Sequence, residues 1–316
     1  MRWTRILAGT LLVALAVGVG ALALEFRRDL YAQQQRVKSG SRVLHTACGD
    51  IEFAESGPAD APALLLVHGS GGGFDQGLAL GQSLAPQGLR LIAPSRFGYL
   101  RSPLSADPSG ERQADHLACL LDALGLANAA LMGVSAGAVS ALHFAVRHPQ
   151  RTRALLLVVP AVYRPDPAVP TPAWALRLLD AIVSADLPLW LLARLAPATA
   201  RRLVLATPPA AYAAAGPDEQ RRADAMLAMI QPVSLRRQGL RNDSRLTTGA
   251  ARVALESIRA PTLCISARDD GFGTYASARY SCQHIPGARF LGFDAGGHLL
   301  LGHRAEVMAA IRTLLR

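Results

Sequence analysis

Short runs of apolar residues recur along this chain and are separated by polar, glycine-rich stretches. A continuous apolar run of five or six residues is typical of a strand that is buried on both faces of a parallel sheet. Two runs near the start, 42–47 and 51–55, have the appearance of an opening hairpin. Strands buried in a sheet are predicted at residues 63–67, 89–93, 154–159, 261–266 and 288–293, and in the run that leads from Leu131 into Gly133.

Helical spacing of apolar residues appears between these runs. Residues 110–124 carry alanine and leucine on one helical face, and Gly125 is placed to end that helix. Residues 303–315 place an apolar face toward the sheet. Between 161 and 249 prolines cluster first, and helical segments rich in Leu, Ala and Arg follow. The alternation predicts an α/β fold, with residues 161–249 (the cap segment) as a helical insertion.

The N-terminus carries an uncharged apolar run of 19 residues, 6–24, with arginines on both sides. Its length is sufficient to span a bilayer and exceeds that of a usual signal-peptide core, although Ala21-Leu22-Ala23 would pass as a cleavage site. We expect residues 1–30 to be a transmembrane anchor rather than a removed signal, and residues 25–40 to be a polar link. An anchor and a removed signal would both place the following domain in the periplasm if the source is bacterial.

Composition adds little to this picture. The formal net charge is +10, but the basic residues are scattered arginines with a single lysine, Lys38. Nucleic-acid binding needs a basic face, usually with interleaved aromatic residues, and neither is present. We therefore expect no nucleic-acid partner. A chain of 316 residues is long enough for one large α/β domain with an insertion.

The segment Gly133-Val134-Ser135-Ala136-Gly137 follows a predicted strand and opens a predicted helix. That context is the one in which Gly-x-Ser-x-Gly forms a nucleophile elbow, a sharp turn that lifts the serine hydroxyl above the sheet. Glycines on either side leave room for the strand and helix to approach closely. Ser135 is the candidate nucleophile.

An acid and a base follow in the chain order that a serine nucleophile requires. Asp269 and Asp270 come just after the strand at 261–266, and His298 follows the strand at 288–293 through Ala295-Gly296-Gly297. The imidazole would take the serine proton, and a carboxylate would hold its tautomer. Asp269 and Asp270 are adjacent, and residue types alone leave both open as the acid.

A glycine-rich loop, His68-Gly69-Ser70-Gly71-Gly72-Gly73 (the oxyanion loop), follows the strand at 63–67. It lacks the Lys-Ser/Thr of a phosphate-binding P-loop, and no dinucleotide-binding glycine pattern accompanies it. Such a loop can direct backbone N–H groups at a developing oxyanion. We expect the donors to be the Ser70 and Ala136 N–H groups, and His68 to brace the loop.

The four cysteines show no metal-ligand or Cys-x-x-Cys spacing. Cys119 and Cys264 lie in apolar stretches and are expected to be buried thiols, while an oxidising compartment would permit one disulfide. Asn242-Asp243-Ser244 matches a glycosylation sequon, to which we give little weight.

From about residue 42 to the C-terminus the chain resembles the α/β-hydrolase superfamily. The resemblance implies Ser135 as nucleophile, Asp270 as acid, His298 as base, Ser70 and Ala136 as oxyanion donors, and no metal or organic cofactor. The loop at 93–99 looks like the family's loop after the next strand. Ala267 stands where the family has glycine before the acid, and Ala138 stands where a second glycine often follows the elbow. The oxyanion loop is similar to that of hydrolases acting on ring-cleavage products.

The expected architecture is an α/β-hydrolase core at 41–160 and 250–316, with a mostly parallel sheet, helices on both faces and a helical cap at 161–249. The expected activity is that of a serine hydrolase on a small, apolar ester-like substrate. Two alternatives stay open: a C–C bond hydrolase acting on vinylogous diketones, and a binding protein that keeps the fold without catalysis.

Overall fold

A computed structural model describes residues 2–86, 88–165, 174, 177, 180–181 and 183–316. It contains a single eight-stranded sheet with the order β1-β2-β4-β3-β5-β6-β7-β8. The strands are β1 (Arg42–Thr46), β2 (Gly49–Ser56), β3 (Ala63–Val67), β4 (Arg90–Pro94), β5 (Ala129–Val134), β6 (Thr152–Val158), β7 (Thr262–Ala267) and β8 (Arg289–Phe293).

The first hairpin is antiparallel, and β2 joins β4 antiparallel; every pairing from β4 to β8 is parallel. Side chains of a strand alternate between two buried clusters. In β3, Leu65 and Val67 belong to one cluster and Leu64 and Leu66 to the other. Both faces of the sheet are therefore covered, which explains why its strands read as continuous apolar runs.

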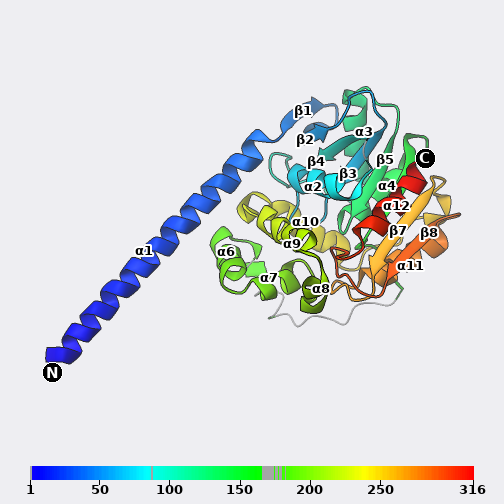
Figure 1. Cartoon of the computed structure of the whole chain (residues 1–316). Helices are drawn as coiled ribbons and strands as arrows, with labels where there is room; N and C mark the ends of the chain where they lie inside the picture. The colour runs from blue at the N-terminus through cyan, green and yellow to red at the C-terminus, as the bar shows by residue number, and fades with distance from the viewer. Residues whose placement is uncertain (1, 87, 166–173, 175–176, 178–179, 182) are drawn as a thin grey trace.

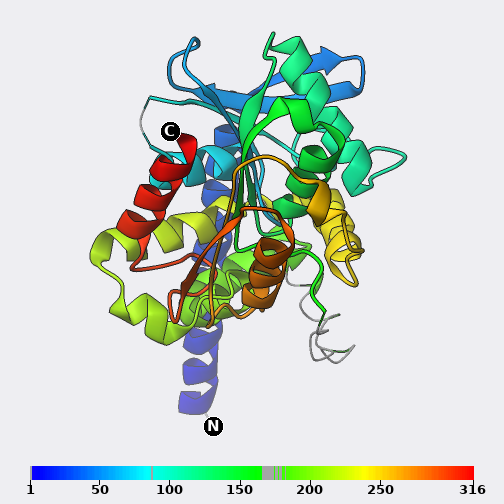
Figure 2. The same cartoon turned by 90° about the vertical axis from the view of Figure 1, so that its right-hand side faces the viewer.

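Helices cover the two faces in separate groups (Figure 2). On one face lie α2 (Phe74–Leu84) and α12 (Arg304–Leu315), which contact each other and the strands. On the other lie α3 (Gly110–Ala123), α4 (Gly137–Arg147) and α11 (Thr274–His284). The parallel strands and their helices place the carboxyl ends of β3, β5, β7 and β8 at one edge of the sheet, where open α/β sheets build their sites.

The cap segment enters between β6 and β7. Its described helices are α6 (Asp186–Leu195), α7 (Pro197–Val204), α8 (Pro209–Ala214), α9 (Pro217–Met229) and α10 (Arg237–Thr247). Three of them, α7, α8 and α9, begin with a proline, which fits the first turn of a helix but cannot continue a preceding one. The cap packs against the core through Leu227, Ile230 and Val233, which join the cluster formed by α2 and the strands.

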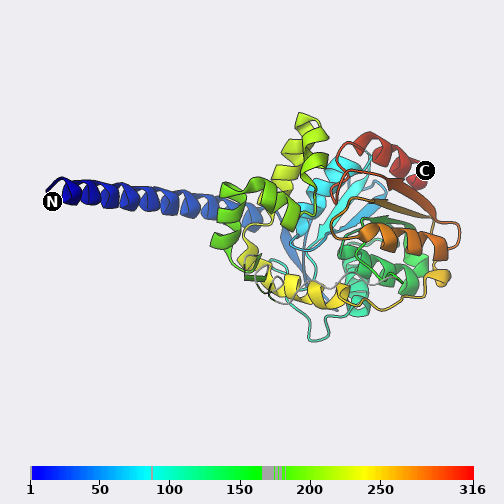
Figure 3. The same ribbon diagram turned by 90° about the horizontal axis from the view of Figure 1, so that it is seen from below.

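Helix α1 (Arg2–Ser39) stands out from the body of the molecule (Figures 1 and 3). The expectation of a polar link at 25–40 is wrong, because the helix continues through it and packs on the cap. The Trp190 indole N–H donates to Asp29 at 3.1 Å, the Trp190 ring meets Phe26 edge-on, and Arg194 pairs with Glu25. By contrast, no residue is buried in the apolar half of α1, residues 9–24.

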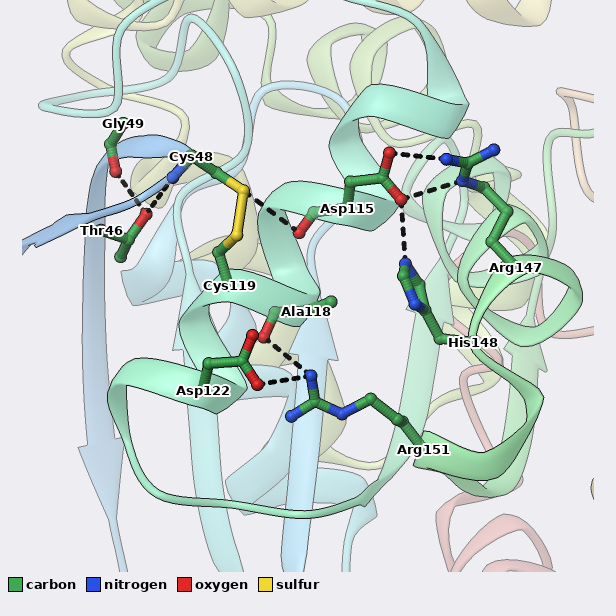
Figure 4. Close-up of a disulfide and its surroundings, with 10 residues drawn as sticks. All are labelled: Thr46, Cys48, Gly49, Asp115, Ala118, Cys119, Asp122, Arg147, His148 and Arg151. Atoms are coloured by element: carbon green, nitrogen blue, oxygen red, sulfur yellow. Dashed lines mark hydrogen bonds and ion pairs between the residues drawn. A yellow bond between two sulfur atoms is a disulfide. The ribbon is translucent and has the colours of Figure 1, made fainter.

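Cys48 and Cys119 form a disulfide that joins the β1–β2 turn to α3 (Figure 4). The expectation that Cys119 is a buried thiol is therefore wrong. The apolar stretch around Cys119 suggested burial, whereas in the structure Cys119 is half-buried and lies beside the β1–β2 turn that carries Cys48. Cys264 is a free, fully buried thiol in β7, as predicted.

The eight predicted strands are confirmed within one or two residues at each end, and so are the helices at 110–124 and 303–315. The helices α2 and α11 were not predicted. Part of the predicted cap, including Leu178, Leu179 and Ile182, falls outside the described residues.

Candidate active site

Ser135 sits at the turn between β5 and α4 with a φ of 52°. A non-glycine residue in this left-handed region is strained and must be held by its surroundings. The Ser135 N–H donates to the Val158 carbonyl at 3.0 Å, and the Ser135 carbonyl accepts from Ala138 and Ala161. A Cβ at position 137 would lie 2.3 Å from the Val67 carbonyl oxygen, so the turn requires glycine there.

His298 and Asp270 are brought together from the ends of β8 and β7. The His298 Nδ1 atom lies 2.8 Å from Asp270 Oδ2. The Phe272 N–H donates to Asp270 Oδ1 at 2.9 Å, and the Thr274 hydroxyl donates to Asp270 Oδ2. Burial opposes ionisation of Asp270, but His298 and these donors outweigh it and lower the pKa of the carboxyl below its usual value. Asp270 is thus a buried carboxylate facing the imidazole.

Asp269 points elsewhere. Its carboxylate accepts hydrogen bonds from the Gly297 N–H at 2.8 Å and the Gly296 N–H at 3.2 Å. Both glycines have positive φ and form the turn that carries His298. The two adjacent carboxylates therefore contact different groups: Asp270 contacts the imidazole, and Asp269 the backbone that presents it.

Two cavities meet at Ser135. The smaller has a volume of about 90 Å³ and is lined by Ser135, His298 and mostly apolar side chains such as Leu80 and Met226. The larger has a volume of about 360 Å³ and is lined by Ser135, Ser70, Ala136 and side chains of the cap, including Leu203 and Leu240. Ser135 therefore faces space on two sides, enclosed by core and cap.

The oxyanion loop passes directly over the nucleophile candidate. A Cβ at position 69 would lie 3.0 Å from Ser135 Cβ and 3.3 Å from the Val134 carbonyl oxygen, so a side chain there would crowd Ser135. Among the hydrogen bonds of the described residues, neither the Ser70 N–H nor the Ala136 N–H donates to a protein acceptor. Both residues line the larger cavity beside Ser135, which leaves these two donors available for a substrate oxygen.

His68 is fully buried beneath the loop. The Arg96 N–H donates to its Nε2 at 3.0 Å, so Nδ1 carries the proton and donates to the Gly69 carbonyl at 2.8 Å. Burial and the Arg96 charge lower the pKa of His68 well below its usual value. A neutral imidazole with both nitrogens engaged braces the loop, as the sequence predicted.

Sequence reasoning missed a buried polar cluster that joins the cap to this loop. Asp243 on α10 accepts from Arg96, Tyr99 and the Ser70 hydroxyl. Helix α10 is rich in charged and polar residues, so a single carboxylate in it gives no signal until its partner is known. The sequon at Asn242 is buried, and its side chain donates to the Pro108 carbonyl. Among the described residues no group of His, Cys, Asp or Glu has an arrangement that could hold a metal ion.

Comparisons with known proteins bear on the fold of the chain. The model of the alpha/beta hydrolase fold family matches residues 62–304. The solved alpha/beta hydrolase fold protein from Nakamurella multipartita is 30% identical, with a TM-score of 0.68 over 87% of this chain and 98% of that one. A solved membrane phospholipase A is 21% identical, with a TM-score of 0.64 over 98% of this chain and 99% of that one, which shows a shared fold.

Two curated relatives match over shorter stretches. A 2-hydroxymuconate semialdehyde hydrolase from Pseudomonas putida is 39% identical over 130 residues, 40% of this chain and 45% of that protein. Lipase 1 from Psychrobacter immobilis is 32% identical over 151 residues, 46% of this chain and 44% of that protein. The chain thus spans about half the length of the curated relatives it matches.

Proposed function

Since the chain belongs to the alpha/beta hydrolase fold family, we propose that it is a serine hydrolase that cleaves an ester-like carbonyl substrate through an acyl-enzyme. The observation that carries the proposal is the His298–Asp270 pair at 2.8 Å, in which His298 lines one cavity together with Ser135 on its strained turn.

In the proposed reaction the Ser135 oxygen attacks the carbonyl carbon while His298 Nε2 takes the hydroxyl proton. Asp270 holds the other ring nitrogen, fixes the tautomer and stabilises the imidazolium. The Ser70 and Ala136 N–H groups stabilise the oxyanion. His298 then returns the proton to the leaving alcohol, and water, activated by the same imidazole, releases the acid from Ser135.

The two cavities support a substrate with groups on both sides of the ester. Both are lined mainly by apolar side chains, which favours hydrocarbon chains over charged groups. We assign the longer chain to the larger cavity, beside the oxyanion donors.

We also propose that α1 anchors the enzyme in a membrane. A window of 18 residues within Gly9–Ser39 has a mean hydropathy of 2.0, and none of it is buried in the protein. Helix α1 is continuous, so Asp29 lies only about 7 Å along the axis beyond the end of the apolar run. The cap helix α6, which contacts Phe26 and Asp29, would then lie at the level of the lipid headgroups. The Cys48–Cys119 disulfide favours an oxidising compartment, the periplasm if the source is bacterial.

The test is labelling with a fluorophosphonate probe followed by peptide mapping. We expect covalent label on Ser135 in the wild type and none in Ser135→Ala. A panel of p-nitrophenyl esters of increasing chain length then defines the acyl preference. Absence of both labelling and ester turnover in folded protein would overturn the proposal.

A second candidate is C–C bond hydrolysis, favoured by one further observation. Arg222 lines the smaller cavity next to His298, and its guanidinium donates to the Leu299 carbonyl at 3.0 Å. Such a group would hold the carboxylate of a dienone acid; the 2-hydroxymuconate semialdehyde in the name of the Pseudomonas putida relative also carries a carboxylate. Turnover of a dienone acid that Arg222→Gln impairs, and that Arg221→Gln at the exposed neighbouring position does not, would support this candidate over the ester.

A further inference from the structure

Two buried charged side chains of the cap segment contact the oxyanion loop: Arg236, which donates to the Gly72 carbonyl, and the carboxylate of Asp243. Asp243 is 2% exposed, and Arg96 forms two hydrogen bonds with it, each of 2.6 Å. The Ser70 hydroxyl donates to Asp243 Oδ2 at 3.0 Å, and the Tyr99 hydroxyl donates to the same oxygen at 2.5 Å. Asp243 comes from α10, whereas Arg96, Tyr99 and Ser70 come from the core.

The partners of Asp243 also hold the loop backbone at successive residues. The Arg96 Nε–H donates to the His68 carbonyl at 2.8 Å, and the Gly71 N–H donates to the Tyr99 hydroxyl oxygen at 3.3 Å. Burial and the neighbouring carboxylate raise the pKa of Tyr99 well above its usual value, so its hydroxyl keeps the proton that it donates to Asp243. Positions 68, 70 and 71 are thus fixed by a single cluster around Asp243.

This geometry bears on catalysis because a loop of three consecutive glycines has little stiffness of its own. The Ser70 N–H must point at the substrate oxygen, and a displacement of about 1 Å costs on the order of a hundredfold in rate. The hydroxyl of the same residue, Ser70, donates a hydrogen bond to Asp243. We propose that Asp243 is a positioning residue, through which the cap sets the orientation of the Ser70 N–H in the oxyanion hole. The inference rests on the proposed function.

The alternative is that the cluster only attaches cap to core, and Asn242 supplies the matched control. It is the preceding residue on α10, is also buried, and bonds the Pro108 carbonyl at 3.0 Å, away from the oxyanion loop. Asn242→Ala removes a cap-to-core hydrogen bond of similar burial without touching the loop.

The test uses three variants: Asp243→Asn, Ser70→Ala and Tyr99→Phe. Ser70→Ala keeps the backbone N–H but cuts the tie to Asp243, and it leaves the Arg96–Asp243 ion pair intact, as does Tyr99→Phe. Stability against urea is measured for each variant, so that catalytic effects are compared only among folded proteins.

For Asp243→Asn and Ser70→Ala we expect kcat on a soluble ester to fall on the order of tenfold to a hundredfold while KM changes little, the pattern for an interaction made only in the transition state. The rate of phosphonylation of Ser135 by a fluorophosphonate should fall in parallel, because that reaction also develops an oxyanion. The smaller change, Tyr99→Phe, should lie between them and wild type. Asn242→Ala should lose stability but keep the wild-type kcat.

Equal kcat losses in Asn242→Ala and Ser70→Ala, or an unchanged kcat in folded Ser70→Ala and Tyr99→Phe, would overturn the positioning role. Wild-type protein that neither labels nor turns over ester would instead reject the proposed function, so the two failures are distinguishable.

Discussion

The sheet and the cap bring different kinds of residue to the site. From the sheet come Ser135, Asp270 and His298, each within a few residues of a strand end and each held by hydrogen bonds from neighbouring turns. The cap brings apolar side chains to both cavities and the carboxylate of Asp243, which contacts the oxyanion loop rather than the reacting groups.

That difference separates two tasks. Groups fixed by the sheet would carry out bond making and proton transfer, whereas groups from the cap would shape the substrate space and adjust one donor. If the division is right, changes at strand ends should abolish turnover, changes in the cap should lower it in part, and changes in the apolar half of α1 should leave it intact.

The largest expected effect is that of Ser135→Ala. Loss of the nucleophile in a triad enzyme costs on the order of 10⁶ in rate. Because alanine tolerates the strained turn no worse than serine, we expect the urea midpoint to change little. Steady-state kinetics on freshly purified variant measure the effect, and retention of most of the activity would exclude the acyl-enzyme mechanism.

The two adjacent carboxylates sharpen the comparison within the sheet. Asp270→Asn should leave His298 in the wrong tautomer and cost about 10⁴ in rate. Asp269→Asn should cost far less in rate, because Asp269 holds the backbone of Gly296 and Gly297 and does not contact the imidazole. Kinetics of the two variants side by side provide the test, and an equal or reversed loss contradicts the assignment.

The core could be predicted from the sequence because its signals are local. A buried parallel strand appears as an apolar run, and the two glycines of the elbow, Gly133 and Gly137, are required by close approaches that a side chain would block. The order of strands also placed an acid and His298 at the same edge of the sheet, and the family resemblance favoured Asp270. Adjacent residues in a turn point in different directions, however, and pattern alone left Asp269 open.

The cap contacts could not be predicted in this way. Asp243 meets Arg96 across 147 positions, and nothing in the residues near either one specifies the pairing. The same holds for the Cys48–Cys119 bond and for the packing of α1 on α6. These contacts depend on how the helices are arranged in three dimensions, which short-range periodicity does not encode.

Lowering the pH should affect stability through histidines of the core and not of the cap, since all eight histidines lie outside residues 161–249. Burial, with a contribution from Arg112, lowers the pKa of His116 to about 4. Between about pH 6.5 and pH 4, His116 is therefore protonated in the unfolded chain but neutral in the folded protein. The free energy of unfolding should fall as the pH drops through this range. Buried His68 acts in the same direction.

Urea midpoints measured across that pH range provide the check. The variant His116→Gln should show a flatter dependence than wild type, while His45→Gln, at an exposed position, should not. A midpoint that rises on acidification would mean that other groups dominate the proton balance.

The smallest effect on turnover is expected from removal of the apolar half of α1. A variant beginning at Glu25 keeps the contacts of Phe26 and Asp29 with Trp190 and the pairing of Arg36 with Asp75. Its kcat/KM on a soluble ester should stay within about twofold of wild type, a difference of less than 0.5 kcal/mol by the ordinary rate relation.

A variant beginning at Gly40 is the matched control: it loses Arg36, which also bonds the Gln231 carbonyl of the cap, and should be less stable. Full-length protein should stay in the membrane pellet through a carbonate wash, whereas the Glu25 variant should be soluble. Release of the full-length product with a mature N-terminus near Leu24 would mean a cleaved signal peptide. A folded but inactive Glu25 variant would mean that the apolar half of α1 supports the site directly. The division of tasks between sheet, cap and α1 would then be wrong.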